Sequence, residues 1–215
     1  MELLPKIVYS NFMQSTAHPF VKWAGGKTQL LPEIRKHYPH RIKKYCEPFV
    51  GGGAVLFDVL QKCHPEEVLI NDVNAELINT YSQIKNNCDN LVKLLSEIQN
   101  KYKSQTLEEN KILFYENRIR YNELKINRDD AENLEKAALF IFLNKTCFNG
   151  LYRVNKRGEF NVPFNNAKNP QICDEENQCV PAKAVGLSAL RHRSFRRNFQ
   201  LLWNFGAPIP HARIA

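Results

Sequence analysis

The stretch Glu47-Pro48-Phe49-Val50-Gly51-Gly52-Gly53-Ala54 decides the fold class of this 215-residue chain. The residues from Ile42 to Val50 predict a strand that runs into three glycines, and those from Ala54 to Lys62 predict a helix with apolar positions at helical spacing. A second short strand is predicted at Val68 to Ile70, ending at Asn71-Asp72. Residues 42–72 therefore predict a β-α-β unit with parallel strands, and a nucleotide-type pocket should open at their carboxyl ends.

The glycine turn and the acid after the second strand together indicate a cofactor that carries a nucleoside. Glycines between a strand and a helix let the backbone approach a ligand closely, and an acid about 20 residues further on, here Asp72, can hydrogen-bond ribose hydroxyls. A dinucleotide fingerprint needs a third, spaced glycine where Leu56 stands, which disfavours a nicotinamide enzyme. A plain tight turn with an aspartate at the strand end is the alternative interpretation.

Upstream lies a second glycine-bearing segment, Lys22-Trp23-Ala24-Gly25-Gly26-Lys27-Thr28. A phosphate-binding loop needs a glycine where Val21 stands, which disfavours a nucleotide triphosphatase. The small residues permit close backbone approach, Trp23 offers a flat apolar surface, and Lys27 offers a cation that can meet a carboxylate. This set suits a ligand that bears an amino acid, and the alternative is a tight turn with a buried tryptophan and a solvated lysine.

The region after Ala75 is mostly helical in pattern and then changes to short extended stretches. Two such stretches, Leu151 to Val154 and Glu159 to Val162, flank a polar loop and predict a β-hairpin. We interpret residues 75–167 as an inserted domain, with helices expected at about 75–86, 88–102, 107–122 and 131–145.

The most distinctive segment, Leu143-Asn144-Lys145-Thr146-Cys147-Phe148-Asn149-Gly150-Leu151-Tyr152-Arg153, leads directly into that hairpin. An exposed aromatic ring can stack in place of a displaced base, and Asn or Arg can read base edges in the major groove. Lys156 and Arg157, in the hairpin loop, can touch phosphates. Such residue types together indicate contact with DNA.

These three segments together resemble the Dam-type adenine-specific DNA methyltransferases, over roughly residues 19–178. The resemblance implies an α/β, Rossmann-type methyltransferase fold with an inserted helical and β-hairpin DNA-recognition domain. It also implies S-adenosylmethionine as cofactor and methyl transfer to adenine N6 in double-stranded DNA. Around the cofactor it places five residues: Trp23, Lys27, Glu47, Phe49 and Asp72.

By the same resemblance, the DNA-contacting residues come from the segments around Lys22 and the hairpin. Phe148 and Leu151 are assigned to the surface that opens the duplex, and packing of these two side chains into the core is the alternative. Asn149 and Arg153 are assigned to base contact. The full set expected to bind DNA is Lys22, Phe148, Asn149, Leu151, Arg153, Lys156 and Arg157.

The chain departs from the family pattern in two places. Family members that read GATC place glycine, arginine and tyrosine after the equivalent of Pro163-Phe164, whereas this chain has Asn165, Asn166 and Ala167, which argues against a GATC target. The family's Asp-Pro-Pro-Tyr motif, which holds the adenine amino group in line with the sulfonium methyl, does not occur in the 215 residues. We therefore assign no catalytic residue to this chain and expect an incomplete sheet.

Charge is distributed unevenly along the chain. Of the formal charge of +8, the 37 residues from Cys179 to Ala215 carry +6, because they contain six Lys or Arg and no acid. We expect a leader at 1–18, the cofactor-binding part at 19–74, a return loop at 168–178 and an atypical Arg-rich tail at 179–215. A reading-frame change near Gln178 would make that tail unrelated to the fold, and a divergent basic tail that binds DNA is the alternative.

Several other functional classes are disfavoured by the sequence. The longest apolar run, Ala137 to Leu143, is far shorter than the ~20 residues that span a bilayer, so we expect a cytoplasmic protein without a membrane partner. The six cysteines include no Cys-x-x-Cys pair, and no metal site is expected. We expect a monomer, with a cognate restriction endonuclease as a candidate partner. Two functions stay open: a site-specific adenine methyltransferase, or a catalytically inactive remnant that binds DNA or cofactor weakly.

Overall fold

The structure, a computed structural model, describes residues 17–127, 130–175 and 187–192. For the last of these segments only the backbone is described. Nearly all of the expected leader, and most of the Arg-rich tail, lie outside the described residues.

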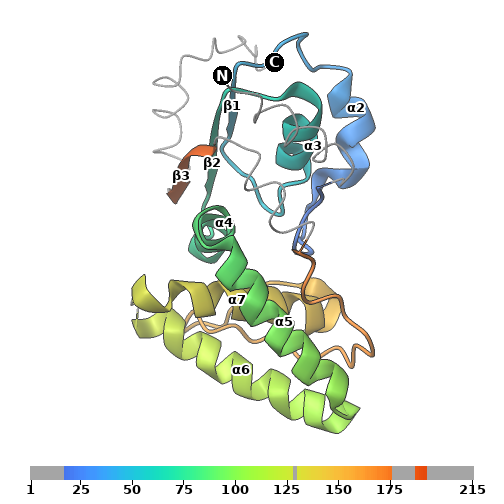
Figure 1. The fold of residues 1–215 in the computed structure, drawn as a ribbon, viewed down its shortest axis with the longest axis vertical. Helices are drawn as coiled ribbons and strands as arrows, with labels where there is room; N and C mark the ends of the chain where they lie inside the picture. The colour runs from blue at the N-terminus through green and yellow to red at the C-terminus, as the bar shows by residue number, and fades with distance from the viewer. Residues whose placement is uncertain (1–16, 128–129, 176–186, 193–215) are drawn as a thin grey trace, which may run out of the picture.

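A parallel sheet forms one part of the molecule (Figure 1). Its strands are β1 (Lys44–Glu47), β2 (Glu67–Asp72) and β3 (Leu187–His192), in the order β1-β2-β3. Helix α3 (Ala54–Cys63) connects β1 to β2, which confirms the predicted β-α-β unit. Strand β1 is shorter than predicted and ends before Pro48, a residue that lacks the N–H needed to continue a ladder.

The third strand corrects the expectation that the chain beyond Gln178 is unrelated to the fold. Residues Leu187–His192 pair in parallel with β2, and the register runs from Val68 opposite Leu187 to Asp72 opposite His192. The tail is therefore part of the sheet over these six residues. The segment Leu-Ser-Ala-Leu-Arg-His contains no β-branched or aromatic residue, so propensity did not predict it. Backbone hydrogen bonding to the open edge of β2 does not depend on side-chain type.

All four predicted helices are present, with ends that differ by a few residues. Helix α4 begins after Asn74, whose side-chain oxygen accepts hydrogen bonds from the N–H groups of Glu76 and Leu77. Helix α6 begins after a capping box in which Thr106 and Glu109 exchange hydrogen bonds. The helices are α4 (Ala75–Asn86), α5 (Cys88–Ser104), α6 (Leu107–Asn127), the short η2 (Asp130–Glu132) and α7 (Asn133–Thr146).

Helix α7 forms the centre of the helical part, and α4, α5 and α6 all pack against it (Figure 1). Every residue from Ala137 to Asn144 is buried, which is typical of a helix that is covered on all sides. Helix α4 contacts both α7 and the strands β2 and β3, so it joins the helical part to the sheet. Among the described helices, none is both long and apolar enough to cross a membrane.

The predicted hairpin is present, but an isolated bridge replaces the two predicted strands. One antiparallel bridge joins Val154 to Phe160, and the tip closes with a hydrogen bond from the Gly158 N–H to the Asn155 carbonyl. Two helical segments before β1 were not predicted: η1 (Lys27–Leu30) and α2 (Leu31–Arg35). They are too short for the 3.6-residue periodicity of apolar positions to be recognised.

Helix α2 is attached to α3 by a buried carboxylate. The side chain of Asp58 is only 7% exposed and accepts hydrogen bonds from Arg35 Nη2 (2.6 Å), Arg35 Nε (3.0 and 3.1 Å) and the Tyr38 hydroxyl (3.0 Å). Burial raises the pKa of Asp58, but the hydrogen bonds from Arg35 and Tyr38 outweigh it and lower the pKa below its ordinary value. The ionised carboxylate therefore stabilises the folded chain.

We predict that Asp58→Asn lowers the free energy of unfolding by about 1.5–3 kcal/mol at pH 7, because Arg35 and Tyr38 lose a charged acceptor. Since the native pKa lies below the unfolded value of about 3.9, this stabilisation is complete above that value and is lost as the pH falls through the native pKa. The difference between the two proteins should therefore shrink in urea titrations from pH 5 downwards. As a matched control, Glu33→Gln removes the exposed Glu33–Lys36 pair and should change stability by less than about 0.5 kcal/mol. Equal effects of the two substitutions would contradict this account.

Candidate functional site

A cleft of about 720 Å³ opens at the carboxyl ends of β1 and β2. It is lined by the segment from Lys22 to Gln29, by the glycine turn from Phe49 to Val55 and by Asp72. Two glycine-bearing segments that are more than 20 residues apart in the sequence thus form one cavity. Of the five residues expected around the cofactor, four line it: Trp23, Lys27, Phe49 and Asp72.

The turn after β1 requires glycine for steric reasons. Gly51 and Gly53 have φ values of +51° and +85°, a region in which side chains are strained. A Cβ on Gly53 would collide with the Tyr81 hydroxyl and the Phe57 ring, and one on Gly51 would lie 3.0 Å from Trp23 Cδ1. The Tyr81 hydroxyl also donates a hydrogen bond to the Gly51 carbonyl (3.0 Å). The open backbone at the floor of the cleft is therefore a consequence of these glycines.

Asp72 holds the glycine turn in place. Its Oδ2 accepts a hydrogen bond from the Gly51 N–H and its Oδ1 accepts one from the Asn74 N–H, each at 2.9 Å. The carboxylate thus connects the turn after β1 to the start of α4. A carboxylate oxygen can accept more than one hydrogen bond, so Asp72 can also accept from a ligand hydroxyl.

Lys27 points its ammonium group toward the end of β1. Its Nζ donates to the Phe49 carbonyl (3.2 Å) and lies 3.6 Å from Glu47 Oε1. An ammonium has three N–H donors, so it can bind a further acceptor in the cleft. The side chain of Lys27 is about half-exposed, and the ring of Phe49 is 47% exposed nearby.

Glu47, the fifth expected cofactor residue, is buried and contacts Lys27. Its Oε2 accepts a hydrogen bond from the Tyr45 hydroxyl (2.7 Å). Burial raises the pKa of Glu47, and the hydrogen bond from Tyr45 and the charge of Lys27 oppose that rise. Burial also raises the pKa of Tyr45, which keeps its phenol neutral and able to donate. The structure thus places Glu47 beside Lys27, one of the residues that line the cleft, and its place around the cofactor stays a prediction.

Trp23 separates the cleft from the helical part. Gly51 lies next to its indole and Gly52 next to its Cβ, and the ring centroids of Trp23 and Tyr152 are 5.6 Å apart, at an interplanar angle of 30°. Phe140 of α7 is a second aromatic neighbour at 6.2 Å. The sequence had predicted a flat surface for a ligand, and the indole also forms a packing contact between the two parts of the chain.

The turn after α7 presents its side chains to solvent. Phe148 is 49% exposed and Leu151 is 38% exposed, so the alternative that they pack into the core is wrong. Asn149 lies between them in the short helix η3 (Phe148–Gly150), at φ +54°, a left-handed conformation that asparagine tolerates. Lys22 is also exposed, and the aliphatic stem of its side chain lies against this turn at Gly150.

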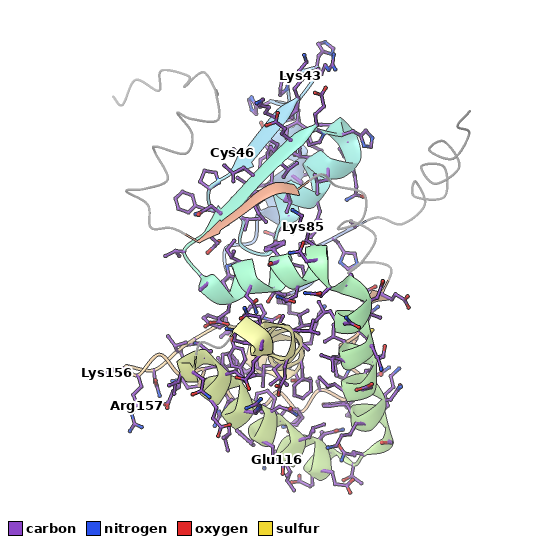
Figure 2. All side chains as sticks on the ribbon, turned by 60° about the vertical axis from the view of Figure 1, so that its left-hand side comes forward. Lys43, Cys46, Lys85, Glu116, Lys156 and Arg157 are labelled. Carbon is purple, nitrogen blue, oxygen red and sulfur yellow. The ribbon has the colours of Figure 1, made fainter. Side chains whose placement is uncertain are left out.

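The hairpin carries the remaining basic residues that were expected at the DNA. Lys156 and Arg157 are exposed at its tip and project away from the helices (Figure 2). Arg153 lies along the hairpin, because its Nε donates to Asn161 Oδ1 (2.8 Å) and its Nη2 to the Asn161 carbonyl (3.3 Å). Part of its guanidinium group stays available for another acceptor.

Sequence reasoning missed the residues that connect the two parts. Asn144 and Tyr152 lay inside the segment that was singled out, but neither was given a role. The available signals were a polar residue at the end of an apolar helical run and an aromatic residue at the entry of the hairpin. The neighbouring Lys145 is partly buried, and this burial lowers its pKa; Asp174 opposes that shift, whereas the charge of Lys22 adds to it.

Comparison with known proteins identifies relatives over most of the chain. Residues 23–198 match the model of the family described as D12 class N6 adenine-specific DNA methyltransferase, a range that extends beyond Gln178. The type II methyltransferase M.MjaIII of Methanocaldococcus jannaschii is 49% identical over 164 residues, which are 74% of this chain and 56% of that protein.

Two further relatives have similar coverage. The type II methyltransferase M1.LlaDCHI of Lactococcus lactis is 40% identical, and the match covers 74% of this chain and 51% of that protein. The DNA adenine methylase of Serratia marcescens is 37% identical, and the match covers 73% of this chain and 52% of that protein. The chain spans about half the length of the curated relatives it matches. Since the family model covers most of its residues, the chain belongs to the D12 class of N6 adenine-specific DNA methyltransferases.

Proposed function

We propose that this chain is the cofactor-binding and DNA-recognition part of an adenine N6 DNA methyltransferase. Residues 19–74 would bind S-adenosylmethionine, and the inserted domain at 75–167 would recognise double-stranded DNA. The observation that carries the proposal is the single cleft lined by both glycine-bearing segments, which adjoins a turn with exposed Phe148 and Leu151. Nucleotide-type ligands bind at this end of parallel strands in open α/β sheets.

The residues of the cleft fit the chemistry of S-adenosylmethionine. A volume of about 720 Å³ lies within the usual range of small-molecule sites. Asp72 can accept hydrogen bonds from ribose hydroxyls, Lys27 can pair with the carboxylate of the methionine part, and the exposed ring of Phe49 can pack against the adenine. When bound, the cofactor supplies an electrophilic methyl group on a sulfonium.

The exposed residues next to the cleft fit a DNA duplex that has been opened at one base. Phe148 and Leu151 can fill the space that a displaced base leaves, and Asn149 and Arg153 can reach base edges. Lys22, Lys156 and Arg157 can neutralise phosphates. Because Asn165, Asn166 and Ala167 replace the family's glycine, arginine and tyrosine, we propose a target other than GATC.

A binding-only remnant is the second candidate function, since Asp-Pro-Pro-Tyr is absent from the 215 residues. Incorporation of labelled methyl groups from S-adenosylmethionine into mixed-sequence DNA separates the two candidates. Transfer to adenine supports the enzyme, and DNA binding without transfer supports the remnant. The type II relatives support a restriction endonuclease as a partner of the whole system.

We predict that Lys27→Gln weakens binding of S-adenosylhomocysteine about tenfold, because a charge-assisted hydrogen bond to the ligand carboxylate is lost. Binding of 5′-methylthioadenosine, which lacks the amino acid, should change by less than about twofold. Isothermal calorimetry with both ligands measures the two effects. Lys36→Gln, directly after the end of α2, removes an exposed lysine outside the cleft; it is the control and should affect neither ligand. Equal weakening of both ligands by Lys27→Gln would refute the assignment of Lys27 to the carboxylate.

We predict different consequences for two classes of hairpin cation. Lys156→Ala or Arg157→Ala should weaken binding to every duplex alike and lower the salt slope by about one. Arg153→Ala should reduce the preference for the cognate sequence by about 1–3 kcal/mol, the usual value for an arginine that reads guanine. Fluorescence titrations of cognate-like and scrambled duplexes at two salt concentrations measure both effects.

Asn161→Ala is the control for hairpin order, since it removes the side-chain acceptor of Arg153 but keeps the guanidinium. If Arg153→Ala lost affinity equally for all duplexes, Arg153 would be a phosphate contact only.

A further inference from the structure

Asn144, near the C-terminal end of α7, connects two segments that lie far apart in the sequence. The side chain is buried, and its carboxamide makes three hydrogen bonds to main-chain groups. Its Oδ1 accepts from the Lys22 N–H (2.9 Å), while its Nδ2 donates to the Lys22 carbonyl (2.9 Å) and to the Gly150 carbonyl (2.8 Å). One carboxamide thus hydrogen-bonds to the N–H and the carbonyl of Lys22 and to the carbonyl of Gly150 in the turn.

A close steric contact accompanies these hydrogen bonds. Gly150 has φ +64°, and a Cβ on it would lie 2.5 Å from Lys22 Cβ. The backbone of the turn at Gly150 therefore lies directly against the aliphatic stem of the Lys22 side chain. The next residue, Trp23, stacks on Tyr152, two residues beyond Gly150. These contacts therefore fix the position of the cleft-lining segment relative to the turn that carries Phe148 and Asn149.

Asn144 differs from an ordinary core residue in that it hydrogen-bonds to main-chain groups of two separate segments. Its partners are main-chain groups of Lys22 and Gly150, so it does not occupy the ammonium end of Lys22, whose side chain is exposed beyond the stem that lies against Gly150. An apolar residue at 144 could fill the same volume, but it would leave three buried main-chain groups without this partner. The carboxamide is the only type of side chain that both donates twice and accepts at one planar end.

We propose that Asn144 is a positioning residue that aligns Lys22 with the Phe148–Leu151 turn, so that both meet the same stretch of DNA. The inference rests on the proposed function, because it gives Asn144 a role only if Lys22 contacts DNA. Asn144 itself is buried and acts through the backbone of Lys22 and Gly150. Its loss should therefore remove the contribution of Lys22 to DNA binding and leave that of distant cations intact.

A double-mutant cycle on DNA binding by the full chain tests this role. The readout is the salt slope of the association constant for a short mixed-sequence duplex. In the unaltered chain, Lys22→Ala and Lys156→Ala should each lower the slope by about one. In the Asn144→Ser background, Lys156→Ala should still lower it by about one, whereas Lys22→Ala should have almost no further effect. Lys156 is the matched control because it lies at the hairpin tip, away from Asn144.

Other results would overturn the inference in distinguishable ways. If Lys22→Ala lowered the slope by about one in both backgrounds, Asn144 would be merely structural and the positioning role would be wrong. If neither lysine substitution changed the slope in the unaltered chain, the proposed DNA surface would fail, and the positioning role with it.

A second variant covers the case in which Asn144→Ser does not fold, as judged by circular dichroism. Gly150→Ala keeps the carboxamide but places a methyl group against Lys22. It should abolish the effect of Lys22→Ala in the same way, and a retained effect would contradict the positioning role.

Discussion

The hydrogen bond from the Gly51 N–H to the Asp72 carboxylate is the interaction on which the remaining structure depends. It joins the turn after β1 to the end of β2, and the second oxygen of Asp72 fixes the start of α4 through Asn74. The floor of the cleft and the entry to the helical part are thus set by one buried side chain. The turn can meet Asp72 in this way because Gly51 and Gly53 adopt left-handed conformations that other residues resist.

The cleft and the hairpin lie in different parts of the chain, and three contacts join those parts. Helix α4 packs on both the sheet and α7, Trp23 stacks on Tyr152, and Asn144 binds the backbone of Lys22. Methyl transfer to a base requires that the cofactor and the displaced nucleotide meet within a small distance. Contacts that join the two parts are therefore consistent with the proposed function, in which one part binds the cofactor and the other the DNA.

The elements that the sequence predicted correctly share strong local signals. The β-α-β unit has apolar runs around a glycine turn, α4 and α5 have apolar residues at helical spacing, and α7 has a continuous apolar run. Strand β3 has no such signal, because its pairing comes from the edge of a strand more than 100 residues earlier. The same holds at the site: its glycines and Lys27 were recognisable, whereas the roles of Asn144 and Glu47 depend on neighbours that only the folded chain brings together.

The central claim is that two separate glycine-bearing segments form one cofactor site, and glycine-selective ¹⁵N labelling tests it directly. Of the seven glycines among the described residues, five line the cleft: Gly25 and Gly26 from one segment and Gly51 to Gly53 from the other. Gly158 lies at the hairpin tip. Titration with S-adenosylhomocysteine should shift the amide signals of both segments with a single dissociation constant and leave Gly158 unchanged. Shifts confined to one segment, or a shift of Gly158 as large as those of the cleft glycines, would contradict the account.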